Sequence, residues 1–354
     1  MLRKVRDGEN MDTAELAIYL HAKALIKNQS SEIEVLQYSN GYSNLTYLLT
    51  VEGKEFVLRR PPLGAIKRGH DMGREYKVLS SLSKHFSKAP KTFVFEETGK
   101  VIGSTFYLME KVNGVVINTQ VAQEKNLGTE DFNLISESWL DAFVEFHALD
   151  YGQVGLGDLG RPSGYVERQV ANWGKQYFKA ATQEIAAAGF VTEWMTEHQP
   201  EQYAHTLVHN DFKYDNMVFE DGQWSQINAI LDWEMCTLGD PMMDLGTSLA
   251  YWVMENDGPL FTKTIPSPTV FAGNPSRSEL VQAYAEKSGR NVDHLVFYYV
   301  FGLFKLAVIV QQIYYRYAKG LTKDPKFSKL DKVCKFLCET GHQAILKQRI
   351  ENLY

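Results

Sequence analysis

Polar and charged residues crowd into one short segment of this 354-residue chain, and apolar residues enclose that segment on both sides. Residues 207–219, LVHNDFKYDNMVF, carry His209, Asp211 and Asn216 in the order H-x-D-x4-N. Apolar runs before and after such a polar stretch are typical of a loop that leaves one buried strand and enters another. The segment therefore predicts a loop whose two ends are held by buried backbone.

A second segment of this kind follows at residues 229–234, AILDWE. Here Asp232 ends a predicted buried strand. An unpaired ionised carboxylate in such a place costs about several kcal/mol. A bound cation is the simplest explanation for a charge at this position.

The two segments together supply the groups that phosphoryl transfer from ATP requires. That reaction needs a carboxylate that accepts the proton of the attacking hydroxyl, and oxygen ligands for Mg²⁺. Asp211 suits the first role, while Asn216 and Asp232 suit the second. We expect His209 to brace the loop through hydrogen bonds to the backbone or to an aspartate such as Asp232 or Asp244.

The same residues carry a family resemblance. HNDFKYDN followed by ILDWEMCTLGDPMMDLG resembles the aminoglycoside phosphotransferase and choline kinase superfamily. The likeness is strongest to the phosphotransferase-like domains that are fused to acyl-CoA dehydrogenases, and it extends over about residues 30–345. It implies an α+β, protein-kinase-like bilobal fold, in which a small antiparallel β-sheet lobe with one helix joins a large, mainly helical lobe.

The resemblance also implies a chemistry and residue roles. Members of this superfamily use MgATP and phosphorylate hydroxyls of small molecules. By motif, Asp211 corresponds to the catalytic base, and Asn216 and Asp232 correspond to the magnesium ligands. ATP, Mg²⁺ and a small-molecule hydroxyl acceptor are therefore the expected partners.

The hydrophobic pattern changes near residue 112, which divides the chain. Before this point, β-rich segments occur at residues 46–51, 55–59, 93–96 and 104–110, with helical spacing over 70–84. After Gly114, helical spacing predominates, at residues 129–149, 163–188, 190–198, 278–289, 293–318 and 327–350, with short strands at 217–219 and 226–231. We predict an N-terminal nucleotide-binding lobe (1–112), a hinge at about 109–114 and a C-terminal helical catalytic and substrate-binding lobe (113–354).

Phosphate-binding residues are expected in the first lobe. Residues 38–46, YSNGYSNLT, resemble the nucleotide loop of the superfamily, in which Ser43 and Asn44 would contact phosphate; an ordinary hairpin turn is the alternative. Arg59 ends a strand at the position where a kinase usually carries Lys. Arginine can pair with both phosphate and carboxylate. Glu75, on the following predicted helix, is its natural partner unless it is simply a solvated helix residue.

The hinge is expected to hold adenine. In the resembling superfamily, backbone groups of this connection hydrogen-bond the base. Glu110 and Val112 are therefore candidate adenine contacts through the main chain, and Met109 is a candidate pocket wall.

The second lobe contains less specific candidates. Residues 155–179 mix glycine turns with basic and aromatic side chains, which suits a helix with a solvated basic face or, alternatively, an acceptor site. The possible acceptor-site residues are Arg168, Trp173, Lys175 and Glu234. Asp244, in the run GDPMMDLG, is expected to brace the catalytic loop or to cap the next helix.

Composition excludes several partners. The formal charge of −6 is too small to indicate a polyanion-binding protein, so no nucleic-acid partner is expected. Three cysteines without a CxxC pair favour a reducing cytoplasm. The apolar stretch over residues 295–310 is shorter than the roughly 20 residues of a membrane span and Lys305 interrupts it, so a buried helix without membrane contact is expected.

We therefore interpret the sequence as an ATP-dependent phosphotransferase acting on a small-molecule hydroxyl. The acceptor stays open among a hydroxyacyl compound, an aminoglycoside-like sugar and an amino alcohol, as do GTP use and the oligomeric state. The alternative is a nucleotide-binding pseudokinase or regulatory module without turnover. A protein kinase is disfavoured because the interval between Asp232 and Asp240 leaves no room for a long activation segment.

Overall fold

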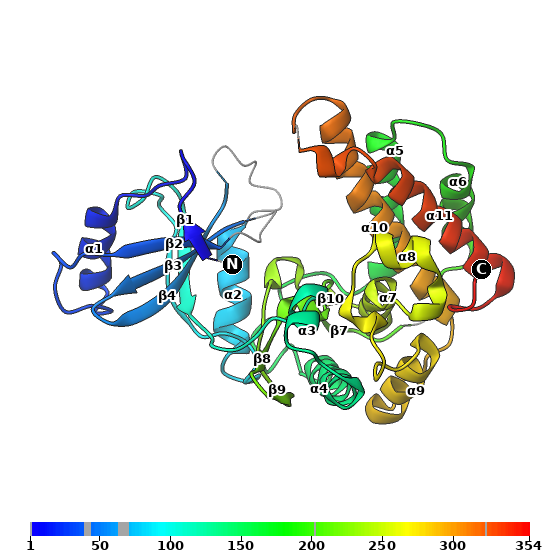
Figure 1. The fold of residues 1–354 in the computed structure, drawn as a ribbon, viewed down its shortest axis with the longest axis horizontal. Coiled ribbons are helices and arrows are strands. Elements are labelled where there is room, and N and C mark those ends of the chain that lie inside the picture. The colour runs from blue at the N-terminus through cyan, green and yellow to red at the C-terminus, as the bar shows by residue number, and fades with distance from the viewer. Residues whose placement is uncertain (1, 39–43, 63–70, 202, 323) are drawn as a thin grey trace. The chain divides into compact units, whose positions relative to one another are not determined.

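A computed structural model of the chain describes residues 2–38, 44–62, 71–201, 203–322 and 324–354 (Figure 1). The chain folds into two compact units. The first unit contains residues 1–114 and 228–236, and the second contains residues 115–227 and 237–354. Residues 228–236, which include Asp232, thus belong with the N-terminal unit although they lie far along the chain.

The first unit is built on one antiparallel sheet of six strands in the order β1-β2-β3-β4-β6-β5. The strands are β1 (Leu2–Lys4), β2 (Glu34–Tyr38), β3 (Leu45–Val51), β4 (Lys54–Arg60), β5 (Thr92–Glu96) and β6 (Phe106–Glu110). The last four confirm the predicted strands to within two residues. Helix α1 (Thr13–Ala22) and strands β1 and β2 are not among the elements predicted above; Leu16 and Leu20 of α1 pack in the core with Leu58 of β4.

Helix α2 (Met72–Leu82) confirms the predicted helix of the first unit and carries Glu75 in its first turn. Asp71 caps this helix, since its carboxylate accepts the Arg74 N–H at 3.0 Å. The helix buries Val78, Leu79 and Leu82, and Glu75 lies on the same buried face with 1% of its surface exposed. The apolar spacing of α2 therefore directs a carboxylate into the interior.

The second unit is mainly helical, as expected, and the predicted fold class is confirmed. Its helices are α3 (Thr119–Glu124), α4 (Thr129–His147), α5 (Tyr165–Ala180), α6 (Ala186–Glu197), α7 (Pro241–Tyr251), α8 (Pro259–Thr264), α9 (Arg277–Ser288), α10 (Leu295–Ala318) and α11 (Leu330–Lys347). Two short sheets pair β7 (Thr206–Val208) with β10 (Thr237–Gly239) and β8 (Met217–Glu220) with β9 (Gln223–Ile230).

One predicted helix is wrong. The expected helix over residues 163–188 ends at Ala180, and α6 begins a new helix at Ala186. The reason is a tertiary contact, because the buried Gln311 of α10 donates its amide to the Ala180 carbonyl at 2.8 Å and to Thr182 Oγ1 at 3.1 Å. This side chain satisfies a terminal carbonyl that helix continuation would otherwise satisfy.

Helix α10 is the core helix of the second unit. It is long and apolar enough to cross a membrane by length and composition, but 72% of its most apolar stretch is buried inside the structure. It packs backbone to backbone against α7. A Cβ added at Gly302 would lie 2.1 Å from the Gly246 carbonyl oxygen, and one added at Gly246 would lie 2.1 Å from the Tyr298 carbonyl oxygen. Glycine at both positions therefore fixes the approach of these two helices.

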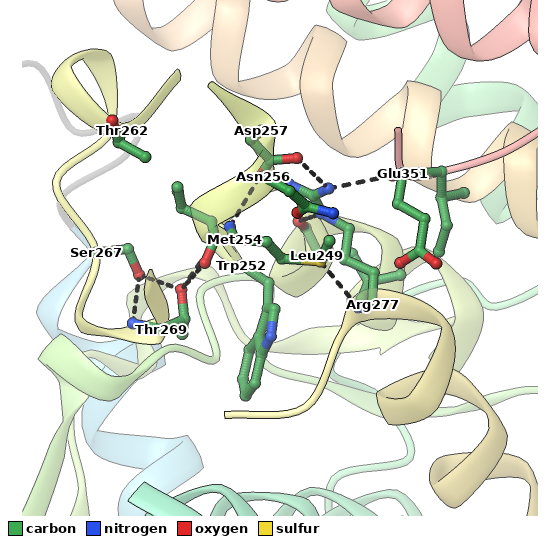
Figure 2. Close-up of polar contacts among 12 residues, drawn as sticks. Leu249, Trp252, Met254, Asn256, Asp257, Thr262, Ser267, Thr269, Arg277 and Glu351 are labelled. Carbon is green, nitrogen blue, oxygen red and sulfur yellow. Dashed lines mark hydrogen bonds and ion pairs between the residues drawn. The ribbon is translucent and has the colours of Figure 1, made fainter. Parts of the chain in front are cut away.

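A buried arginine ties the segment after α7 to the rest of the unit (Figure 2). Arg277 Nη1 and Nη2 bind the Asp257 carboxylate at 2.8 and 2.5 Å, and Nε donates to the Leu249 carbonyl at 3.4 Å. Nearby, the Thr269 hydroxyl donates to the Val253 carbonyl at 2.9 Å. These contacts tie Asp257 and the end of α7 to Arg277 at the start of α9, and join Thr269 to Val253.

The Arg277–Asp257 pair yields a test of the fold. Replacing Arg277 by Met leaves the Asp257 carboxylate nearly buried and unpaired, so the free energy of unfolding should fall by about 3–5 kcal/mol. Urea unfolding followed by circular dichroism measures this change. Lys287→Met, which removes an exposed partner of Asp141, is the control and should change stability by less than about 1 kcal/mol. Equal losses in the two variants would contradict the assigned role.

Candidate active site

Arg59 organises a charged cluster within the first unit. It stands near the end of β4, opposite Thr46 of β3 and Tyr107 of β6. Its Nη1 donates to Glu75 Oε1 at 2.5 Å, and its Nη2 donates to Asp232 Oδ1 at 3.3 Å. The guanidinium thus bridges the helix carboxylate of α2 and the carboxylate that follows β9.

Burial and the neighbouring charges shift the pKa values of Arg59 and Glu75 in opposite directions. Burial lowers the pKa of Arg59, but the negative groups around it, of which Glu75 contributes most, together outweigh burial and hold the pKa above its usual range. Burial raises the pKa of Glu75 although the Arg59 charge opposes this. A third carboxylate, Glu234, has its Oε2 at 3.8 Å from Arg59 Nη2. One guanidinium therefore faces three carboxylates, and this excess of negative charge favours a cation.

The segment that carries Asp232 and Glu234 is rigidly held. Asp232 has a left-handed backbone with φ +66°, which few residues other than glycine adopt. The next residue, Trp233, is buried and donates its indole N–H to the Ile230 carbonyl at 2.7 Å. Asn44 donates its amide to Glu234 Oε2 at 2.8 Å. Ser43, predicted with Asn44 as a phosphate contact, lies outside the described residues.

The predicted hinge follows strand β6. Met109 is 7% exposed and pairs across the sheet with Val57. The Glu110 N–H is already used by the Lys91 carbonyl at 2.9 Å. Val112 lies beyond the strand, and within the described part of the chain its main chain makes no hydrogen bond. Its backbone groups are therefore available to a ligand, whereas the N–H of Glu110 is not.

The H-x-D-x4-N loop lies in the second unit between β7 and β8. Asn216 Nδ2 donates to Asp211 Oδ2 at 2.7 Å and to the Asp211 carbonyl at 2.9 Å. Lys213, which the sequence analysis did not select, donates to Asp211 Oδ1 at 2.9 Å. The Asp211 side chain keeps 18% of its surface exposed. The structure thus brings Asp211 and Asn216 together; Asp232 belongs to the first unit, and its convergence with them stays a prediction.

Asp244 braces this loop from helix α7. Its Oδ2 accepts the His209 N–H at 2.6 Å, and its Oδ1 accepts the Asn210 N–H at 2.7 Å. His147 Nε2 lies 3.3 Å from Oδ2. His209 acts locally, because its Nδ1 accepts the Asp211 N–H at 3.2 Å. His209 and Asp244 therefore hold successive amides of the loop.

A small cavity of 30 Å³ lies beside the loop, lined by Lys213, Tyr251 and residues 265–269 among others. Its volume suits about one water or hydroxyl group. Lys213 Nζ lies 4.5 Å from the centre of the Tyr251 ring. Burial lowers the pKa of Lys213, but Tyr251 and Asp211 raise it above its usual value. Lys213 is thus a cation held against Asp211.

Three of the four predicted acceptor residues, Arg168, Trp173 and Lys175, lie on helix α5. The exposed Arg168 donates to the Ser163 carbonyl at 2.5 Å and also binds the Arg161 carbonyl, so it closes the turn before α5. Lys175 is exposed, and Trp173 is half-buried with its indole N–H on Gln169 at 3.1 Å. Glu234 belongs to the first unit.

The protein oxygens that the structure describes are alone too few to bind magnesium, and phosphate oxygens would have to supply the remaining ligands. Among the described residues, no group of three or more His, Cys, Asp or Glu side chains is placed to hold a metal ion. Mg²⁺ in nucleotide sites is commonly bound by one or two protein oxygens together with phosphates and water. Asn216 uses its amide nitrogen on Asp211, and its Oδ1 accepts no hydrogen bond from the described residues. Asn216 Oδ1 in the second unit and the partly exposed Asp232 carboxylate in the first unit are each oxygen donors of the kind that Mg²⁺ binds.

A small antiparallel sheet unit, joined to a helical unit that carries this loop, defines a protein-kinase-like phosphotransferase. The chain belongs to the phosphotransferase enzyme family known as APH, which matches residues 34–266. This match confirms the family resemblance drawn from the two motifs.

Similar proteins fall into two groups. Human acyl-CoA dehydrogenase family member 11 is 29% identical over 97% of this chain, and mouse family member 10 is 28% identical over 94%. The chain spans only 44% and 31% of these relatives. A solved structure of a candidate aminoglycoside phosphotransferase from Ralstonia eutropha JMP134 is 28% identical, with a TM-score of 0.82 over 96% of this chain and 99% of that one.

More distant structures share the fold alone. Aminoglycoside phosphotransferase APH(4)-Ia, solved with AMP-PNP and hygromycin B, is 14% identical, with a TM-score of 0.57 over 93% of this chain and 98% of that one. Macrolide 2′-phosphotransferase type I is 16% identical, with a TM-score of 0.58 over 93% of this chain and 98% of that one.

The burial of His147 predicts a pH dependence of stability. Burial lowers the pKa of His147 below its usual 6.5 in spite of the Asp244 charge. As the pH falls through 6.5, the unfolded chain therefore binds a proton that the folded chain does not, and stability is lost by up to about 1.4 kcal/mol per pH unit. Above pH 6.5 the ring is neutral in both states and contributes no slope.

Urea unfolding at pH 7.5, 6.0 and 5.0 measures this effect. His147→Gln should show a shallower loss of unfolding free energy between pH 6.5 and 5 than the parent. His205→Gln, which alters an exposed histidine of the same unit, should keep the parental slope. An unchanged slope in His147→Gln would show that this ring does not titrate as argued.

Proposed function

We propose that this protein is a MgATP-dependent phosphotransferase that moves the γ-phosphate of ATP to a hydroxyl of a small molecule. The observation that carries the proposal is that the Asp211 carboxylate is held in one orientation and is partly exposed. Asn216 and Lys213 orient its carboxylate, two amides of its loop are held by Asp244, and part of its surface stays exposed. A carboxylate fixed in this way is suited to accept a proton from a bound hydroxyl.

Asp211 has acceptor capacity left for that proton. An ionised carboxylate offers about four lone-pair positions, and Lys213 and Asn216 occupy one on each oxygen. The acceptor hydroxyl would donate to a remaining position and become a better nucleophile as its proton moves. Lys213, whose charge lies next to this carboxylate, would offset negative charge on the incoming phosphoryl group.

The nucleotide would be held by groups from the first unit. Arg59 supplies positive charge for phosphate, Asn44 supplies an amide, and the main chain of Val112 supplies free backbone groups for adenine. Asn216 Oδ1 and Asp232 would hold Mg²⁺, which supplies charge neutralisation on the β- and γ-phosphates. The structures of APH(4)-Ia with AMP-PNP and with ADP support ATP as the donor.

A hydroxyacyl compound is the acceptor that we favour. The curated relatives are named as acyl-CoA dehydrogenases, and this chain matches only part of each of them. A phosphotransferase unit joined to such an enzyme would most simply act on the same acyl compounds. Aminoglycoside-like sugars and amino alcohols are the comparison classes, because hygromycin B is bound by a structural neighbour.

Replacing Asp211 by Asn tests the function. The neutral amide cannot accept the hydroxyl proton, so kcat for acceptor phosphorylation should fall by roughly 10²–10⁴-fold while nucleotide binding persists. The parent is screened with MgATP and panels of hydroxyacyl, sugar and amino-alcohol compounds, with mass spectrometry of the products. Asp221→Asn, an exposed carboxylate of the same unit, is the control and should keep the parental rate. Equal rates in Asp211→Asn and the parent would refute the assignment of the base.

Arg59→Lys tests the phosphate clamp. A lysine ammonium is a point charge and cannot reach Glu75 and Asp232 as the two nitrogens of Arg59 do. The KM for ATP should therefore rise by about tenfold, or roughly 1.4 kcal/mol. Arg60→Lys is the matched control, because the buried Arg60 binds the Glu9 carbonyl and the Tyr47 hydroxyl instead. A rise in KM of the same size in Arg60→Lys would show a general effect of the strand rather than a clamp.

A further inference from the structure

A buried lysine contacts the loop that carries Asp211. Lys305 lies in the middle of helix α10 and exposes 2% of its surface. Its Nζ donates to the Asn210 carbonyl at 2.9 Å and to Asn210 Oδ1 at 3.1 Å. Within the described residues it forms no ion pair with a carboxylate. Lysine is rarely buried without a charged partner, because loss of hydration is costly.

Asn210 is the residue that Lys305 restrains. Its backbone is left-handed with φ +68°. Its N–H binds Asp244 Oδ1 at 2.7 Å, and its carbonyl binds Lys305. Asn210 is thus held at both backbone polar groups, in a left-handed conformation that asparagine adopts more readily than most residues other than glycine.

The same contact reaches Asp211 through one peptide plane. The Asn210 carbonyl and the Asp211 N–H belong to a single planar peptide group. Lys305 binds the carbonyl end at 2.9 Å, and His209 Nδ1 accepts the N–H end at 3.2 Å. Rotation of this plane would change the direction in which the Asp211 side chain leaves the backbone. The two contacts oppose that rotation.

The surroundings make the ammonium costly to keep. Burial lowers the pKa of Lys305 to about 8, although Asp244 and Asp211 raise it, and Lys213 lowers it further. The centre of the Trp173 ring on α5 lies 5.8 Å from Nζ. An apolar side chain of similar length would avoid this desolvation cost. A buried charge of this kind lowers the stability of the fold, and its contact with the loop that carries Asp211 therefore indicates a functional role.

We propose that Lys305 is a positioning residue that fixes the Asn210–Asp211 peptide plane and so aims the Asp211 carboxylate at the acceptor hydroxyl. This inference rests on the proposed phosphotransfer. Lys305 would act on Asp211 through the backbone, since its side chain binds Asn210 and not Asp211 itself.

Lys305→Met in the full chain tests the proposal by three measurements. The kcat for MgATP turnover should fall by at least about tenfold, while the KM for ATP stays within about twofold. The unfolding temperature should equal or exceed that of the parent, because the buried charge is gone. Hydrogen–deuterium exchange should become faster in peptides that cover residues 209–216, and exchange in α10 should stay slow.

Gln311→Met is the matched control, since Gln311 is a buried polar residue of the same helix that only caps α5. It should lower the unfolding temperature and leave kcat unchanged. An unchanged kcat in Lys305→Met overturns the proposal, and so does a kcat loss accompanied by a lower unfolding temperature like that of Gln311→Met. Unchanged exchange over residues 209–216 also overturns it.

The two proposals fail in different ways. If the parent enzyme turns over no ATP with any acceptor panel, the proposed function fails. The exchange measurement then decides the role of Lys305 alone. Faster exchange over residues 209–216 supports its hold on the peptide plane, and unchanged exchange rejects it.

Discussion

The geometry of the loop that carries Asp211 depends on the hydrogen bonds that its backbone makes to the Asp244 carboxylate. This carboxylate accepts two successive backbone N–H groups, from His209 and Asn210, in a place without exposure to water. Hydrogen bonds from backbone amides to an ionised carboxylate are strong, and buried amides without such a partner would be costly. Because these amides come directly before Asp211, the position of Asp244 determines where the loop that carries Asp211 turns.

Asp244 is in turn located by the packing of α7 on α10. Gly246 and Gly302 let the two helices touch through their backbones, so the carboxylate and Lys305 approach the loop from two fixed helices. A larger residue at either glycine would push α7 outward. The distance between the helix axes is therefore coupled to the hydrogen bonds that shape the loop, and a core packing constraint becomes a constraint on the site.

The sequence predicted those parts of the site that depend on the spacing of residues within a short segment. The H-x-D-x4-N spacing identified Asp211 and Asn216 as neighbours, and helical spacing in α2 predicted a helix that carries Glu75. Lys305 was noticed only as an interruption of an apolar stretch, because its partner Asn210 is remote in sequence. The break before α6 depends on Gln311 for the same reason, and no local signal reports either contact.

The identity of residue 59 follows from the number of carboxylates around it. A lysine would satisfy Glu75, but the structure places Asp232 and Glu234 near the same side chain. A guanidinium presents separate nitrogens to separate carboxylates, which a compact ammonium cannot do in one rotamer. Even so, one positive charge does not balance three negative ones, and a bound cation such as Mg²⁺ would compensate the remaining negative charge. Arginine at this position is therefore consistent with a phosphate clamp that needs a bound cation to complete the balance of charge.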